Sequence, residues 1–157
     1  MIFLFQVPHI FAQNISPEGR WKTISDKTGK VTSIVTISQA ENMLGGKVTE
    51  LFRKPEQDPN PLWTKYPDVQ KDQSIIGLTI LSGLTKDGGE WSGGKILDPD
   101  NGKFYNCYIK VEEHGQKLHV RDYLGISLGG RTQTWDRMKW FYSFIHMKDG
   151  AKEPSTH

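Results

Sequence analysis

The sequence predicts an all-β domain in which eight antiparallel strands run up and down and close into a barrel. Several segments alternate apolar and polar residues with period two, which is typical of a sheet with one dry and one wet face. The 157 residues include 16 glycines and 8 prolines, which suits many tight turns and few long helices. A meander of long strands must hide its edges, and closure into a barrel removes them. A sandwich is the main alternative, although its strands are usually shorter.

The predicted strands are segments rich in Val, Ile, Thr, Tyr and Trp that lie between turn signals. They cover residues 19–24, 31–37, 43–51, 75–82, 90–97, 103–112, 116–123 and 131–140.

In the first half of the chain, the strands are predicted from the alternation of apolar and polar residues, and the turns between them have weaker signals than those of the second half. The first strand opens with Gly19-Arg20-Trp21, and the turn Asp26–Gly29 separates it from the second. Along the second strand, Val35 and Ile37 fall on one face of the sheet. A weak turn over 39–42 then leads into the third strand.

In the second half of the chain, stronger turn signals separate the predicted strands. The turns are Lys86–Gly89, Asp98–Gly102, Glu113–Gly115 and Gly125–Gly130. The strongest is Asp98–Gly102, because its Asn-Gly pair tolerates the positive φ of a tight hairpin. Between these turns, apolar residues alternate toward the dry face of the strands 103–112 and 116–123. Arg121 falls on the wet face, opposite Val120.

A long segment, Arg53–Ser74, interrupts the strands. It carries four prolines together with Leu62, Trp63 and Tyr66. Long loops of this kind are usually functional or mobile, so we predict a lid over one barrel mouth with a short helical turn near 62–66. The alternative is an ordinary surface excursion pinned by Trp63.

The ends of the chain lie outside the predicted barrel domain, which covers residues 15–148. Met1–Ala12 is an apolar run that is too short to span a bilayer. It resembles the core of a secretory signal peptide, so we expect residues 1–14 to direct export to the periplasm or the exterior; a docked first strand is the alternative. The apolar spacing of residues 140–147 predicts either a short C-terminal helix or an extension of the last strand. Residues 149–157 are predicted to form a disordered tail.

The floor of the barrel is predicted from its first and last strands. Gly19 lets the chain approach closely while the Trp21 indole plugs the floor. A cation from the last strand can lie over that ring. Arg131 and Arg137 are both candidates, and Arg137 is preferred because Arg131 lies too near the preceding turn.

These features resemble a known class of proteins. Gly19-Arg20-Trp21 and a late arginine look like two signatures of the lipocalins and related calycin barrels. A longer set of sequence motifs is more specific; it consists of Gly93–Pro99, Asn101–Cys107, Leu118–Gly125 and Gly130–Trp135. Together these stretches resemble an uncharacterised family of small exported bacterial proteins, a domain of unknown function with a lipocalin-like barrel. That family carries glycine where this chain has Asp122.

The resemblance implies that a small apolar or amphipathic molecule, such as a fatty acid or another lipid-like compound, binds in the barrel. Tyr105 would offer a hydroxyl anchor and Arg121 a fork for carboxylates. The predicted lining residues are Val35, Ile37, Leu44, Ile76, Leu78, Leu81, Tyr105, Cys107, Ile109, Leu118 and Val120. The alternative is a solid core with no cavity, because buried apolar residues mostly serve packing.

Other classes of function find little support in the sequence. The single cysteine, Cys107, excludes an intramolecular disulfide framework and cysteine-rich metal sites, and no histidine pair has metal-ligand spacing. We therefore expect no metal, no cofactor and no enzymatic activity. Twenty basic residues are matched by 18 acidic ones, so we expect no nucleic-acid partner. The alternative to a ligand carrier is a filled barrel that acts in protein interaction, as a monomer or a homodimer, through loop 53–74 or the aromatic strip 140–147.

Overall fold

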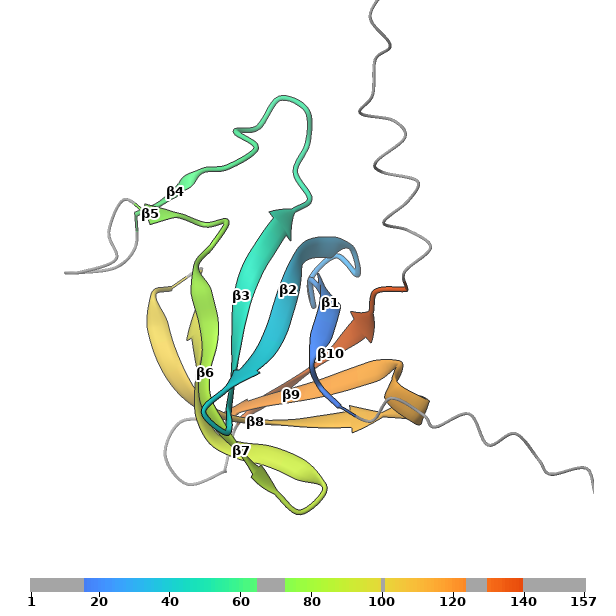
Figure 1. The fold of residues 1–157 in the computed structure, drawn as a ribbon. Coiled ribbons are helices and arrows are strands. Elements are labelled where there is room, and N and C mark those ends of the chain that lie inside the picture. The colour runs from blue at the N-terminus through green and yellow to red at the C-terminus, as the bar shows by residue number, and fades with distance from the viewer. Residues whose placement is uncertain (1–15, 65–72, 100, 124–129, 140–157) are drawn as a thin grey trace, which may run out of the picture.

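The eight long strands of the computed structural model form one closed antiparallel barrel (Figure 1). The structure describes residues 16–64, 73–99, 101–123 and 130–139. Around the barrel the strand order is β1-β10-β9-β8-β7-β6-β3-β2, so each strand pairs with its neighbours in the chain and β1 closes on β10. The prediction of an eight-stranded up-and-down barrel is confirmed.

The barrel strands are β1 (Gly19–Ile24), β2 (Val31–Ala40), β3 (Met43–Leu51), β6 (Thr79–Asp87), β7 (Glu90–Asp98), β8 (Lys103–Glu112), β9 (Lys117–Tyr123) and β10 (Arg131–Arg137). Two further short strands, β4 (Leu62–Trp63) and β5 (Gln73–Ser74), pair with each other in the long connection between β3 and β6. A 3-10 turn, η1 (Glu113–Gly115), joins β8 to β9.

Strands β1, β3 and β8 have the predicted bounds, whereas β2 extends beyond its prediction to Ala40. The turn after it consists only of Glu41 and Asn42, which have φ angles of 51° and 63°. Two consecutive residues with positive φ match the twist of the flanking strands in a tight hairpin.

The predicted strand 75–82 is displaced, because β6 runs from Thr79 to Asp87. The apolar run that suggested a strand start is instead a turn: Gly77 has a φ of 96°, and the N–H of Leu78 donates to the Ile75 carbonyl. At the other end, Asp87 pairs with Glu90 across a Gly-Gly hairpin.

The connections define two different ends of the barrel. The tight turns β2–β3, β6–β7 and β8–β9 lie at the end where β1 begins, which we call the floor. The connections that follow β1, β3, β7 and β9 lie at the opposite end, which we call the mouth. The long β3–β6 connection therefore belongs to the mouth, beside the ends of β3 and β6 (Figure 1).

The floor is sealed by Trp21 and Arg137. Trp21 is fully buried, and its Nε1–H donates to the Pro17 carbonyl. The Arg137 guanidinium lies 4.1 Å from the centre of the Trp21 ring and donates to the carbonyls of Ser16 and Glu18 at 2.6 and 2.9 Å, as well as to that of Gly115. Burial lowers the pKa of Arg137.

Gly19 allows this arrangement because it has a φ of 131°. A Cβ at this position would also come within 2.9 Å of the Arg137 guanidinium. The structure thus places Gly19, Trp21 and Arg137 together at the floor.

Several predicted features lie outside the described residues, namely Tyr66 and the segments 1–14, 140–147 and 149–157. The predicted bounds of the barrel domain, residues 15 and 148, also lie outside them. Loop 53–74 contains strand β4 at Leu62–Trp63, where a helical turn was predicted. In the described part of the chain, we find no helix with the length and apolar character needed to cross a membrane.

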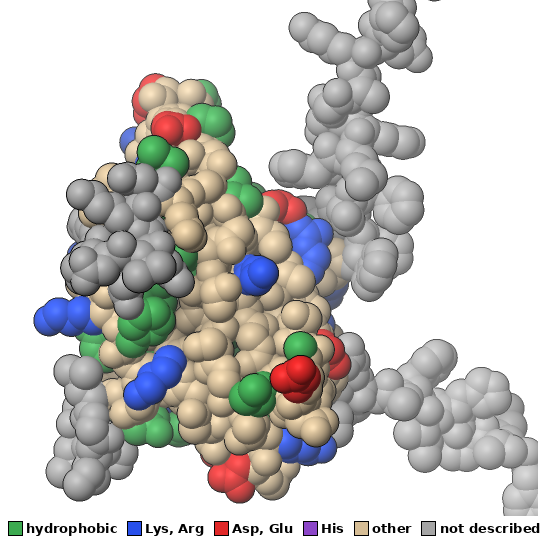
Figure 2. All heavy atoms as spheres, turned by 60° about the vertical axis from the view of Figure 1, so that its left-hand side comes forward, with side chains coloured by type: hydrophobic (Ala, Val, Ile, Leu, Met, Phe, Trp, Pro, Cys, Tyr) green, Lys and Arg blue, Asp and Glu red, His purple; other side chains and the backbone are tan. Residues whose placement is uncertain are grey.

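The described surface carries both charged and apolar side chains. Figure 2 shows Lys, Arg, Asp and Glu side chains dispersed over one face, with apolar side chains between them. The exposed large apolar residues are Met43, Phe52, Leu62, Ile76 and Phe104.

Candidate ligand cavity at the barrel mouth

The barrel is hollow at its mouth. A cavity of about 490 Å³ lies there, within the range of about 300–1,000 Å³ that is typical of small-molecule sites. The main apolar side chains of its wall are Val48, Leu51, Phe52, Ile75, Ile80, Ile96, Leu97 and Trp135. Its polar side chains are Thr23, Ser25, Asp26, Lys27, Thr32, Ser33, Arg53, Gln57, Asp98, Tyr105, Asp122, Arg131 and Gln133.

The cavity is lined by a different set of residues from the predicted one. Tyr105 is the only one of the eleven predicted lining residues that borders it. Nine of the others are buried in the hydrophobic core without touching this cavity: Val35, Ile37, Leu44, Leu78, Leu81, Cys107, Ile109, Leu118 and Val120. The period-two pattern identified the inward face correctly, but side chains such as Trp21 and Leu84 fill its floor half.

Ile76 was predicted to face inward, and this was wrong. It is 37% exposed and lies in the turn before β6. Its neighbour Ile75 lines the cavity instead, since β6 begins only at Thr79.

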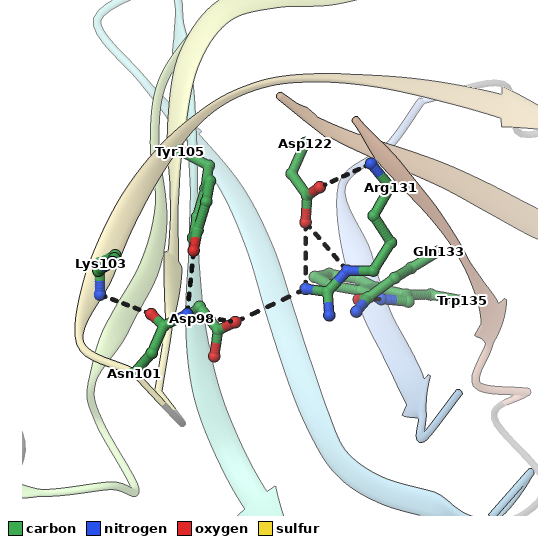
Figure 3. Close-up of polar contacts among 8 residues, drawn as sticks. All are labelled: Asp98, Asn101, Lys103, Tyr105, Asp122, Arg131, Gln133 and Trp135. Atoms are coloured by element: carbon green, nitrogen blue, oxygen red, sulfur yellow. Dashed lines mark hydrogen bonds and ion pairs between the residues drawn. The ribbon is translucent and has the colours of Figure 1, made fainter. Parts of the chain in front are cut away.

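The most buried charge at the mouth is the carboxylate of Asp122, on β9. The Arg131 side chain donates from Nε and Nη2 to Oδ2 of Asp122 at 3.2 and 3.1 Å, and the Arg131 backbone N–H donates to Oδ1 at 3.0 Å (Figure 3). Arg131 and Asp122 are paired residues of β10 and β9, so the strand register itself brings the two groups together.

A second acidic residue extends this pair. Oδ2 of Asp98, at the end of β7, lies 3.8 Å from Nη2 of Arg131. The Asn101 amide donates to Asp98 at 3.2 Å and to the Tyr105 hydroxyl at 2.9 Å (Figure 3). These residues come from the β7–β8 hairpin, and they face the β9–β10 pair across the mouth.

A group of hydroxyls lies on the β1–β2 side of the cavity. The Thr23 hydroxyl is 2.8 Å from that of Thr32 and 2.6 Å from that of Ser33. The cavity therefore combines apolar side chains with a hydroxyl region and the Asp98–Asp122–Arg131 cluster, and Asp26, Lys27 and Arg53 line it as well.

Arg121, predicted as a possible carboxylate fork, faces outward as its alternation indicated. Its Nη1 donates to the Thr132 hydroxyl at 3.0 Å in an exposed position, and it does not line the cavity. Arg131 is the arginine that does. Sequence reasoning missed it, although the same alternation that turns Arg121 outward turns Asp122 inward and could have indicated a buried partner.

The loop predicted as a lid borders the mouth through Arg53 and Gln57, and the residues that flank it, Phe52 and Ile75, line the cavity as well. Trp63 is 2% exposed, packs in the core, and donates from Nε1 to the Pro99 carbonyl at 2.9 Å. This bond attaches the loop to the β7–β8 hairpin. Leu62 is 56% exposed and points away from the core.

Cys107 is buried on the inward face of β8. The pKa of its thiol is raised to about 12, chiefly by burial and also by the negative charge of Asp122, while Lys95 acts in the opposite direction. The thiol is therefore neutral near pH 7, which argues against a nucleophilic role. Among the residues that the structure describes, no group of three or more His, Cys, Asp or Glu side chains is placed to hold a metal ion.

Comparison with known proteins agrees with this architecture. Residues 19–137 match the family described as "Uncharacterized protein conserved in bacteria (DUF2147)". Among solved structures, the chain is similar to protein HP1028 from the human pathogen Helicobacter pylori, which is described as belonging to the lipocalin family. That likeness has a TM-score of 0.71 at 20% identity and covers 85% of this chain and 90% of the other. No curated protein sequence matches the chain.

Proposed function

The chain belongs to the DUF2147 family of bacterial proteins and folds as a lipocalin-like barrel, and from this premise we propose that it binds a small amphipathic molecule. The apolar part of the ligand lies between the walls of the mouth cavity, and its polar part faces the groups around Arg131. Such a protein acts as a carrier or sensor of its ligand and performs no reaction on it.

One observation carries this proposal: the barrel has a sealed floor and a hollow mouth. The floor is sealed by Trp21 and Arg137, whereas the mouth holds a cavity of about 490 Å³ with apolar walls. Each Å² of apolar surface that a ligand buries there stabilises the complex by about 25 cal/mol, less the cost of immobilising the ligand.

We place this binding outside the cytoplasm. The apolar segment Met1–Ala12 resembles a secretory signal peptide, and the single cysteine is compatible with an oxidising compartment. N-terminal sequencing of the protein recovered from the periplasm tests this, and an intact Met1 would contradict it.

The binding proposal is tested by closing the cavity. Val48 lines the mouth from β3 and is 3% exposed, so Val48→Phe puts a larger side chain into the hollow. Met43, on the same strand at the floor end, is 43% exposed, and Met43→Phe is the matched control. Binding of monododecanoylglycerol below its aggregation concentration is measured by calorimetry and by amide chemical shifts.

We expect the wild type and Met43→Phe to bind the amphiphile alike, with shifts at Ile75, Ile80 and Trp135, and Val48→Phe to bind about tenfold more weakly or not at all. Equal binding by Val48→Phe, or shifts confined to the outer surface, would place the ligand elsewhere and refute the proposal.

The exposed apolar residues Leu62, in loop 53–74, and Phe52, directly before it, favour a second candidate, a protein-interaction role through this part of the mouth. Phe52 and Leu62 are 45% and 56% exposed, and exposed apolar surface can mark an interface. Concentration-dependent association that Phe52→Ser abolishes would support this role.

A further inference from the structure

Beside the apolar cavity lies a second, smaller one of about 310 Å³. It is lined by Asp98, Asn101, Tyr105, Asp122, Tyr123, Gly130 and Arg131. Four of these residues, Asp98, Tyr105, Asp122 and Arg131, also line the larger cavity. The charged cluster, whose contacts Figure 3 shows, therefore lines both spaces.

The lining of this polar chamber, as we call the second cavity, offers both donors and acceptors. Carboxylates such as Asp98 and Asp122 only accept hydrogen bonds, and a guanidinium only donates. The Tyr105 hydroxyl accepts from Asn101, and its own proton has no acceptor among the described residues. Nη1 of Arg131 likewise has no acceptor among them.

The positive charge of Arg131 is already more than balanced, because two carboxylates face this one guanidinium. Its Nε and Nη2 both face Asp122, and Nη2 also lies 3.8 Å from Asp98. A free carboxylate entering the polar chamber would meet Arg131 but also two negative groups, and an ammonium would meet the two acids but also the guanidinium. Either ion would exchange its hydration for a chamber that already contains its own sign of charge.

A hydroxyl group both donates and accepts, so several hydroxyls on neighbouring carbons can satisfy carboxylate, guanidinium and phenol together. We propose that the polar chamber binds an uncharged head group rich in hydroxyls, such as a glycerol or a sugar, on a ligand whose apolar chain occupies the larger cavity. This inference rests on the proposed function and narrows its ligand class.

The backbone fixes the geometry of the polar chamber. Gly130 passes so close to β9 that a Cβ on it would lie 2.2 Å from the carbonyl oxygen of Asp122. This close approach sets the position of Arg131 directly after it, and the Arg131 backbone N–H in turn holds Asp122. Preorganised groups of this kind reduce the ordering cost of binding.

The test compares three ligands with the same dodecyl-type chain: monododecanoylglycerol, dodecanoic acid and dodecylamine, each as monomers near pH 7. We expect the glycerol ester to bind the full-length protein about tenfold more tightly than either ion. A tighter or equal affinity for dodecanoic acid or dodecylamine would overturn the head-group assignment and leave the carrier function standing. Failure of all three to bind would overturn both.

A matched pair of variants locates the head group. Tyr105→Phe removes one hydroxyl from the polar chamber, whereas Tyr108→Phe removes one from the opposite face of β8. Tyr105→Phe should weaken binding of the glycerol ester about fivefold and leave dodecanoic acid unaffected, with no change for Tyr108→Phe. Equal effects of the two variants, or an equal loss for both ligands, would contradict the assignment.

Discussion

At the scale of single residues, the pair Asp122–Arg131 shows how strand register creates a polar site inside an apolar barrel. Asp122 is 7% exposed, and an unpaired carboxylate at that depth would be costly. The cross-strand partner on β10 supplies both side-chain and backbone donors. The site therefore exists because two residues that pair across β9 and β10 both point inward.

Removing the Arg131 side chain should leave Asp122 with only its backbone donor. We expect Arg131→Met to lower the free energy of unfolding by about 1–3 kcal/mol, as measured by urea denaturation. Arg121→Met is the control, because Arg121 is an outward-facing arginine on the neighbouring strand; it should cost less than about 0.5 kcal/mol. Equal losses would mean that Asp122 is not held by Arg131.

Cys107 makes stability depend on pH in the alkaline range. Its pKa is raised by burial from the ordinary 9.0 to about 12 in the folded protein, so between these values the folded state holds a proton that the unfolded state has lost. The contribution of the protonated Cys107 thiol to the free energy of unfolding is complete below pH 9.0 and is lost as the pH rises toward about 12. We expect the wild type to lose up to about 4 kcal/mol more than Cys107→Ala over this interval, as measured by urea unfolding. Parallel curves for the two proteins would show that the thiol does not contribute.

At the scale of elements, the turns explain which strands could be predicted. The ends of β8 followed from the sequence because the turns Asp98–Gly102 and Glu113–Gly115 flank it, whereas β1 and β3 followed from their apolar pattern with weaker turns beside them. The start of β6 could not be predicted, since Ile75, Ile76 and Leu78 have strand-like composition and only the positive φ of Gly77 turns the chain there. The backbone of the turn, rather than the side chains around it, decides where this strand begins.

The close approach of β9 and β10 depends on glycine at position 130. Gly130→Ala would place its Cβ against the Asp122 carbonyl, so we expect a loss of about 1–3 kcal/mol in stability and faster amide exchange at Arg131. Gly89 has nothing within 4 Å of an added Cβ, and Gly89→Ala is the control. A neutral Gly130→Ala would show that the two strands can separate at no cost.

At the scale of the whole molecule, the sequence could predict a closed barrel with an inward apolar face, but not where that face is filled. Alternation marks the side of the sheet on which a residue lies and carries no information about empty volume. Val35 and Val48 show the difference, because they are Cα partners on β2 and β3. Val48 borders the cavity, whereas a Cβ on Gly46 would already lie 3.1 Å from Val35.

The same substitution, valine to phenylalanine, should therefore affect stability differently at these two positions. Val35→Phe overpacks the filled half and should cost about 1–3 kcal/mol or more, whereas Val48→Phe extends into the hollow and should leave the melting temperature nearly unchanged. Thermal unfolding followed by circular dichroism measures both. Destabilisation of similar size would indicate that the mouth of the barrel has no spare room.

The bonds of Arg137 join parts of the chain that are made at very different times. This side chain binds the carbonyl of Ser16, 121 positions earlier in the sequence, and its strand is the last piece of the wall. During synthesis, the first strand must wait for the final one to leave the ribosome, and until then two sheet edges remain available to other nascent chains. Closure of the barrel is therefore a late event, and we expect a chain that stops before residue 131 to present an open sheet that is prone to aggregate.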